Sequence, residues 1–172
     1  MGIHHVAIAT KDAKATHEFY TGAMGFRLVK VEVGRAGQDG FAKHLFYDTG
    51  GGGMIAFWDF HDPDLGDDWS PAIATGLGLP GWSNHLAFDA SDEADLQARL
   101  ERWLEHGLKC WEIDHGWCKS IYVMDPNDIM VEFCVSTREF TEQDTREALA
   151  LLEEQKPELG PPPPVKIHKA ER

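Results

Sequence analysis

Apolar positions along the chain follow two spacings, one typical of strands and one typical of helices. Residues 3–9 are a short apolar run at strand length, and residues 12–24 carry apolar positions about one helical turn apart before Gly25. The alternating and apolar runs that follow predict three strands, at 26–33, 41–49 and 54–60. The first part of the chain is therefore expected to fold as one strand, one helix and three strands.

The second part of the chain repeats this order. Residues 84–90 predict a strand, and residues 92–106 predict a helix with leucines four positions apart. Three more strands are predicted at 108–113, 117–124 and 129–135, the last two joined by the turn residues 125–128. The sequence thus predicts two tandem βαβββ modules and an α+β fold.

The repeat is visible in individual residues as well as in the order of elements. His85 lies 80 residues after His5, and each opens an apolar strand. An offset of 76 residues places 41–57 over 117–133, so that Phe46 falls on Tyr122. The loops between helix and strand are free to differ in length, which explains the change of offset. We expect the modules to share one barrel, within one chain or exchanged across a dimer.

Three segments lie outside or between the modules. The modules span about 3–60 and 84–137 of a domain at 1–140, and the connection 59–83 is long enough to serve as a functional lid. Residues 141–156 predict a helix that opens with a Thr141–Asp144 capping signal. The region 141–172 is then expected to end as an extended tail at Pro161 to Pro164.

Charge and composition exclude several classes of partner. The chain has 16 Lys and Arg against 29 Asp and Glu, a net charge of −13, which is unsuited to nucleic acid or anionic membranes. Its three cysteines form no CxxC pair and no disulfide framework. No secretory signal or membrane-spanning stretch is recognisable, so a cytoplasmic location is expected.

Two histidines and one glutamate suggest a metal site. His5 and His85 share their strand faces with small residues, which leaves room for a ligand, and Glu132 interrupts an apolar strand where a lone carboxylate is costly to bury. Two imidazoles and one carboxylate suit Fe(II), with Mn(II), Ni(II) or Zn(II) as alternatives. The residues alone also allow hydrogen-bonded core histidines and a glutamate paired with arginine.

The segments HVAIATKD (5–12), NHLAFDASD (84–92) and SIYVMDPNDIMVEF (120–133) resemble the vicinal oxygen chelate superfamily. This superfamily includes glyoxalases, fosfomycin-resistance enzymes, bleomycin-resistance proteins and extradiol dioxygenases. The resemblance implies an open barrel around a divalent metal, with His5, His85 and Glu132 at three ligand positions. Glyoxalases usually carry a fourth ligand where this chain has Ala56, so the site is more similar to those of extradiol dioxygenases and fosfomycin-resistance enzymes.

The same resemblance suggests further roles near the metal. Tyr122 lies 10 residues before Glu132, a spacing at which extradiol dioxygenases hydrogen-bond a catecholate. Independently of the resemblance, the loop residue His115 is a candidate proton carrier, because the reference pKa of histidine lies near neutrality; the alternative is a surface histidine without a role. The family's usual catalytic histidine is replaced by glycines 50–53, and neither His44 nor His115 is in its position.

Aromatic residues near strand ends and in the connection predict an apolar substrate pocket. The candidates are Phe57, Trp58, Phe60, Trp69, Trp82 and Trp117. The resemblance implies a metal-dependent, homodimeric enzyme for a small molecule that chelates the metal through adjacent oxygens, and together with the aromatic residues it makes extradiol cleavage of a catechol-like substrate the first choice. The alternatives are a redox-neutral lyase or isomerase, a thiol transferase, and a metal-free binding protein of the bleomycin-resistance kind.

Overall fold

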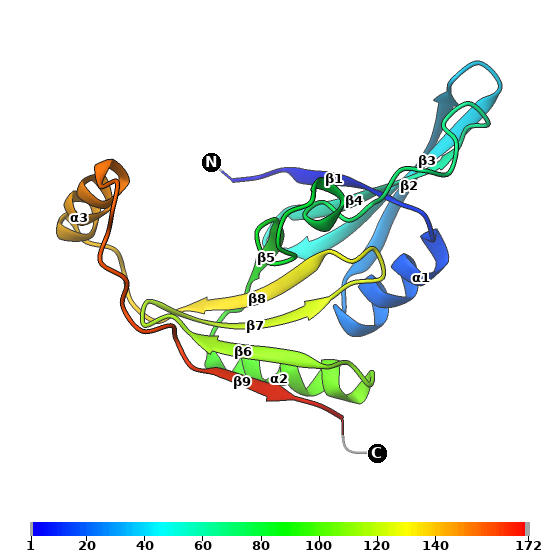
Figure 1. The fold of residues 1–172 in the computed structure, drawn as a ribbon. Coiled ribbons are helices and arrows are strands. Elements are labelled where there is room, and N and C mark those ends of the chain that lie inside the picture. Colours follow the sequence, from blue (N-terminus) through cyan, green and yellow to red (C-terminus); the bar gives the residue numbers. More distant parts are fainter. Residues whose placement is uncertain (1, 171–172) are drawn as a thin grey trace.

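The computed structural model describes residues 2–170, which form two open β-sheets with helices against them (Figure 1). The first sheet, sheet A, has the order β1-β4-β3-β2, and the second, sheet B, has the order β5-β8-β7-β6-β9. Sheet A contains β1 (His5–Thr10), β2 (Arg27–Ala36), β3 (Gly40–Gly50) and β4 (Gly53–His61). Sheet B contains β5 (His85–Asp89), β6 (Cys110–Asp114), β7 (Cys118–Met124), β8 (Met130–Ser136) and β9 (Val165–His168). The predicted α+β fold of two βαβββ modules is confirmed, and neither sheet closes into a barrel.

The helix of each module begins at an aspartate that caps it. Asp12 accepts a hydrogen bond from the backbone of Ala15 at the start of α1 (Ala13–Glu18), which continues as the π-helical turn η1 (Phe19–Ala23). Asp92 does the same at α2 (Glu93–Glu105). Each cap satisfies an amide that has no partner inside the helix, which is why both helices start at equivalent positions of the repeat.

The strand register confirms the internal repeat at the level of single residues. In sheet A, β1 and β4 run parallel with Ala7 opposite Ala56. In sheet B, β5 and β8 run parallel with Ala87 opposite Glu132. Because both pairs obey the predicted offsets, Ala56 is the counterpart of Glu132. The neighbouring antiparallel strands agree, with Phe46 opposite Ala56 and Tyr122 opposite Glu132.

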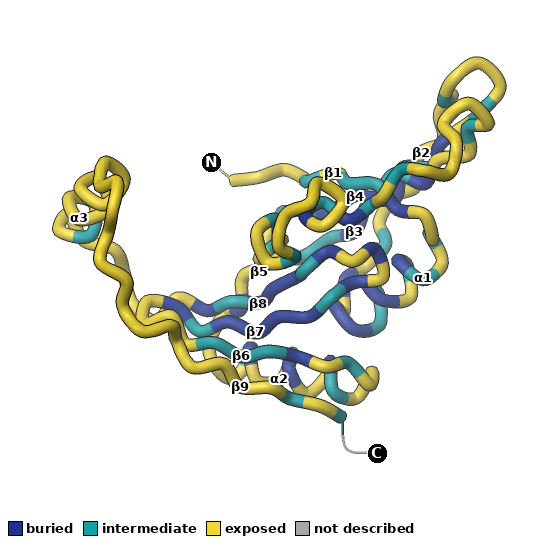
Figure 2. The backbone as a smooth tube through the Cα atoms, viewed as in Figure 1, coloured by how far each residue is buried: buried dark blue, intermediate teal, exposed yellow. Residues whose placement is uncertain are grey.

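One hydrophobic core joins the modules (Figure 2). Phe26, just after η1, packs edge-to-face on Phe88 of β5 and Phe133 of β8, with ring centroids 4.9 and 6.1 Å apart. Phe57 is fully buried in this core, and its ring centroid lies 4.6 Å from that of Tyr20. The prediction that Phe57 lines a substrate pocket is therefore wrong, because its side chain faces the helices.

A buried polar network also links the modules through the turn between β7 and β8. Asp125 accepts hydrogen bonds from the Tyr20 hydroxyl at 3.0 Å and from the backbone amides of Asn127 and Ile129 at 2.8 and 2.9 Å. The Asn127 side-chain amide donates to Asp125 at 3.1 Å and to the Thr16 hydroxyl at 3.2 Å. This network fixes α1 and η1 of the first module against the second.

Asp125→Ala is expected to lower the free energy of unfolding by about 3 kcal/mol, because it leaves several buried donors without an acceptor. Urea denaturation of the variant measures this loss. Asp128→Asn is the matched control, since Asp128 is exposed in the same turn and asparagine tolerates its positive φ of 56°. Equal stability of both variants would show that the network contributes nothing.

The C-terminal region differs from the predicted free tail. The predicted helix is present as α3 (Glu142–Glu153), starts with a Thr141 capping box and stands away from the sheets (Figure 1). After Pro161–Pro164, however, the chain returns to sheet B, where β9 pairs antiparallel with β6. No strand was predicted beyond Pro164, where the VKIH segment adds a strand to the open edge of sheet B.

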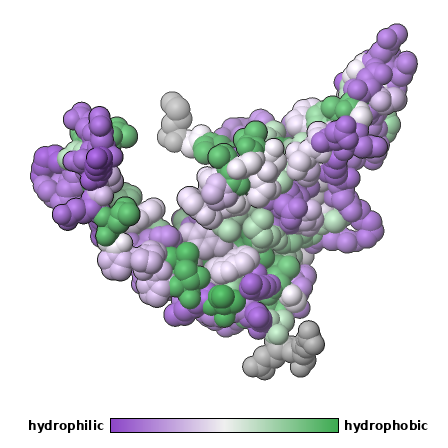
Figure 3. Space-filling model, in the orientation of Figure 1, coloured by the Kyte–Doolittle hydropathy of each residue, from purple (hydrophilic) through white to green (hydrophobic). Residues whose placement is uncertain are grey.

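The other connections lie at the periphery. The connection between the modules contains only the short turn η2 (Thr75–Leu77). In the view of Figure 3, the β2–β3 hairpin and α3 present mainly hydrophilic surface, while apolar surface gathers between them. None of the helices described in residues 2–170 has both the length and the apolar character needed to cross a membrane.

Candidate functional site

Three side chains of the predicted site lie together on the face of sheet B opposite α2. Strand alternation and register bring His85, Tyr122 and Glu132 to this face, since residues two apart share a side. His85 Nε2 lies 2.9 Å from Glu132 Oε2. Glu132 is only 5% exposed, so its carboxylate is largely shielded from water. The structure thus brings two of the three predicted metal ligands into contact.

The surroundings of His85 fit a metal ligand. Its Nδ1 lies 2.9 Å from the backbone oxygen of Trp82, which favours the tautomer that leaves a lone pair on Nε2. Metal-binding histidines generally use the second ring nitrogen in this way. An imidazole nitrogen and a buried carboxylate are also donors that Fe(II), Mn(II), Ni(II) and Zn(II) accept. His85 and Glu132 could therefore hold a divalent metal.

Tyr122 and His115 form a hydrogen-bonded pair beside these two residues. The Tyr122 hydroxyl lies 2.9 Å from His115 Nε2, and the Tyr122 ring centroid is 6.1 Å from that of His85. Burial, followed by the nearby Glu132 carboxylate, raises the pKa of Tyr122 above its ordinary value. The tyrosine therefore stays protonated at neutral pH and can donate a hydrogen bond to a ligand oxygen.

An apolar cavity of ≈ 390 Å³ opens over this group. Its lining residues are Trp82, His85, Trp111, Ile113, His115, Tyr122, Met130 and Val165. Two histidines and a tyrosine supply most of its polar groups, and the other lining side chains are aromatic or aliphatic, which is typical of a small-molecule site. Trp111 and Ile113 were not predicted from sequence as pocket residues, and they lie opposite Tyr122 and Ser120 on the neighbouring strand.

Of the predicted pocket aromatics, only Trp82 lines this cavity. Trp58 stacks on His44 in sheet A with ring centroids 3.7 Å apart. Trp69 and Phe60 meet in a separate part of the molecule, with ring centroids 6.3 Å apart. Trp117 packs against Phe140 near the start of α3. These four side chains belong to other surfaces of the isolated chain.

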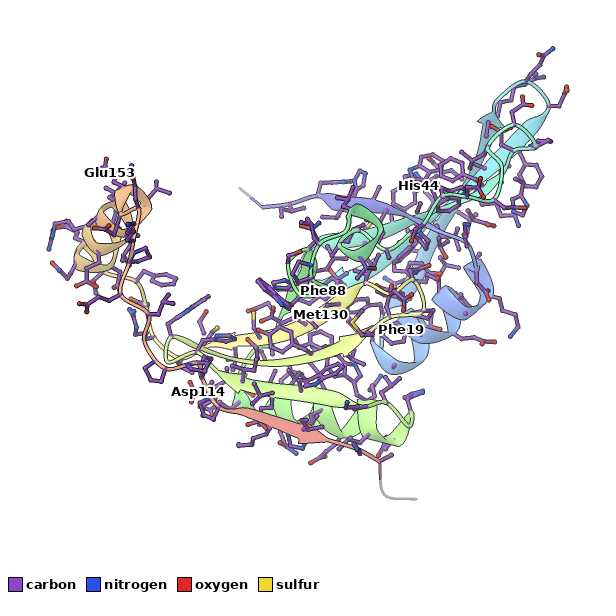
Figure 4. All side chains as sticks on the ribbon, viewed as in Figure 1. Phe19, His44, Phe88, Asp114, Met130 and Glu153 are labelled. Carbon is purple, nitrogen blue, oxygen red and sulfur yellow. The ribbon has the colours of Figure 1, made fainter. Side chains whose placement is uncertain are left out.

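His5 lies on sheet A, away from the other two predicted ligands. Its Nδ1 contacts His4 Nδ1 at 2.8 Å, and its ring lies near His44 and Phe46. Within residues 2–170, no group of three or more His, Cys, Asp or Glu side chains is arranged to hold a metal ion. Figure 4 labels His44 on β3 in one sheet and Met130 on β8 in the other. The three predicted ligands are therefore divided within one chain between two candidate half-sites, one with His5 and one with His85 and Glu132.

The fold is shared with several solved structures. One is a lactoylglutathione lyase from Agrobacterium tumefaciens, 22% identical with a TM-score of 0.52, covering 78% of this chain and 92% of that one. Another is a genomically encoded fosfomycin resistance protein from Listeria monocytogenes, 19% identical with a TM-score of 0.55, covering 84% and 98%. A third is an antibiotic binding protein from a Streptomyces species, 16% identical with a TM-score of 0.53, covering 80% and 97%.

These similarities concern the fold, because all three identities are low. A comparison with curated proteins finds no matching sequence. A family model, however, matches residues 2–133, which cover the first module and the second module as far as Phe133 in β8. The chain belongs to the Glyoxalase/Bleomycin resistance protein/Dioxygenase superfamily.

Proposed function

We propose that the protein is a metal-dependent enzyme whose site holds one divalent ion and a small substrate with adjacent oxygens. The observation that carries this proposal is the contact of His85 Nε2 with the buried Glu132 carboxylate, supported by the Trp82 carbonyl at His85 Nδ1. If Glu132 had only a structural role, its hydrogen bond with His85 would be sufficient. Such a role would not explain the adjacent apolar cavity with Tyr122 and His115 in its wall.

The third ligand is His5 from a second copy of the chain, so that the active form is a homodimer with two shared sites. His5 and His85 occupy equivalent positions, and each uses Nδ1 for a contact within its own chain. Each Nε2 is then the nitrogen available to a metal. Because the half-sites lie apart in one chain, a two-fold dimer that faces sheet A with sheet B would complete both at once.

When bound, the metal ion would polarise the chelating substrate oxygens and, as Fe(II), would supply redox chemistry with dioxygen. The residues of the chain have separate tasks. Tyr122 donates its hydrogen bond to a substrate oxygen and holds the negative charge that develops there. His115, on the other side of the Tyr122 hydroxyl, replaces or removes the proton.

The lining of the cavity favours a flat, apolar substrate. Trp82, Trp111 and Ile113 offer aromatic and aliphatic contacts, and none of the lining residues is a lysine or arginine that would attract a phosphate. A catechol-like diol fits this environment better than a phosphorylated or acyl-CoA substrate. Extradiol ring cleavage is therefore the first activity to test.

The test is oxygen uptake by protein loaded anaerobically with Fe(II), supplied with catechol, 3-methylcatechol and 2,3-dihydroxybiphenyl. We expect uptake together with a yellow ring-fission product, and neither with the Glu132→Ala variant. Metal-dependent turnover of a hemithioacetal or an epoxide without oxygen uptake would instead identify a redox-neutral enzyme. Tight binding of an antibiotic by metal-free protein, with no turnover, would identify a binding protein.

A further inference from the structure

The C-terminal strand supplies part of the candidate substrate cavity. Val165 of β9 is one of the cavity's lining residues. The family model ends at residue 133, and the three solved structures cover 78–84% of this chain. The strand therefore lies beyond the region matched by the family model, yet it reaches the site.

Contacts within the chain hold β9 in this place. The strand pairs antiparallel with β6, where Ile113 lies opposite Val165 and Trp111 opposite Ile167. On the other face of β6, Glu112 lies 2.7 Å from Lys166 Nζ and 2.8 Å from His168 Nε2. The backbone pairing with β6 and the contacts of Glu112 with Lys166 and His168 hold the strand in place. Val165 therefore lies against the cavity in the absence of a ligand.

The side chains that β9 presents are apolar but exposed. Val165 is 52% exposed and Ile167 is 56% exposed, on the face of sheet B that also carries Trp111 and Ile113. An apolar ligand that covers exposed apolar side chains beside a cavity removes their surface from water, which favours binding. Trp111, Ile113 and Val165 line the cavity, and Ile167 lies on the same face without lining it.

We propose that β9 is a specificity element, and that Val165 selects substrates carrying a bulky, flat apolar portion of about two fused rings. This portion lies against Trp111, Ile113 and Val165, while the oxygen-bearing end points toward His85 and Tyr122. The inference rests on the proposed function for its orientation, but binding of the apolar portion requires neither metal nor turnover.

The test uses metal-free protein and 2-naphthol, which has one hydroxyl and cannot chelate through adjacent oxygens. Calorimetry should show binding to the unmodified protein and a loss of affinity of about tenfold or more in Val165→Trp, which fills the cavity. Ile167→Trp is the matched control, because Ile167 is equally exposed on the same strand but does not line the cavity; its affinity should change less than about twofold. Val165→Asp, which adds a charge to the wall, should weaken binding as Val165→Trp does.

The outcomes separate this inference from the proposed function. Equal affinities of Val165→Trp and Ile167→Trp, or no binding of 2-naphthol by unmodified protein, would overturn the role of β9. A selective loss in both Val165 variants supports that role even if no diol is turned over, in which case the proposed ring cleavage fails alone. Circular dichroism of each variant shows that sheet B has kept its structure.

Discussion

A mixture of His5→Ala and His85→Ala chains should regain metal that neither variant holds alone. Each variant is expected to lose most of its metal, because two remaining ligands hold a borderline ion poorly. After subunit exchange, a mixed dimer combines an intact His5 from one chain with an intact His85 and Glu132 from the other. Random exchange makes half of the dimers mixed, each with one intact site, so the metal content should reach about a quarter of that of the unmodified protein.

The control mixture contains His85→Ala and Glu132→Ala. Both changes fall in the same half-site, so every mixed dimer has two damaged sites and the metal content should stay at the level of the single variants. Metal analysis after gel filtration provides the measurement, with light scattering to confirm dimers. If the first mixture regains no more metal than this control although both form mixed dimers, His5 and His85 do not share a site across chains.

Much of the fold follows from alternation and repetition in the sequence. The strands were predicted to within a few residues because most of them have an apolar face against the helices, and a shift by one residue would expose that face. The same alternation explains the error at Phe57. Phe57 and Trp58 are neighbours on β4, so they point to opposite faces, and only Trp58 shares the face of His5. The strand β9 was missed because four residues after a proline run carry little periodic signal.

The site was predictable only within each module. The repeat correctly related His85, Glu132 and Tyr122 to their counterparts, since pairing partners in a sheet follow from register. Residue spacing does not encode how whole sheets are arranged, so it did not reveal that His5 lies on a different sheet from His85 and Glu132. The contact of Tyr122 with His115 likewise depends on the path of an irregular loop. The contribution of Val165 to the cavity depends on a strand that lies outside the two modules.

Tyr122→Phe should keep its metal and lose turnover by a factor of about 10²–10³. The hydroxyl is removed without changing the ring, which is packed near that of His85, so the fold and the ligand pair should remain. What disappears is the donor that faces charge developing on the substrate oxygen. Steady-state rates with the diol that the unmodified protein turns over, together with metal content, measure the two effects separately.

The double variant Tyr122→Phe with His115→Ala shows whether the two residues act in series. Because His115 contacts the Tyr122 hydroxyl, its contribution to proton movement passes through that hydroxyl. We therefore expect His115→Ala alone to slow turnover less than Tyr122→Phe, and to add almost nothing once the hydroxyl is absent. The control is His17→Ala, which removes a histidine that contacts a tyrosine hydroxyl outside the candidate site. His17 Nδ1 lies 3.2 Å from the Tyr47 hydroxyl. Additive losses in the double variant would mean that His115 acts on the substrate independently, and full activity of Tyr122→Phe would remove Tyr122 from the mechanism.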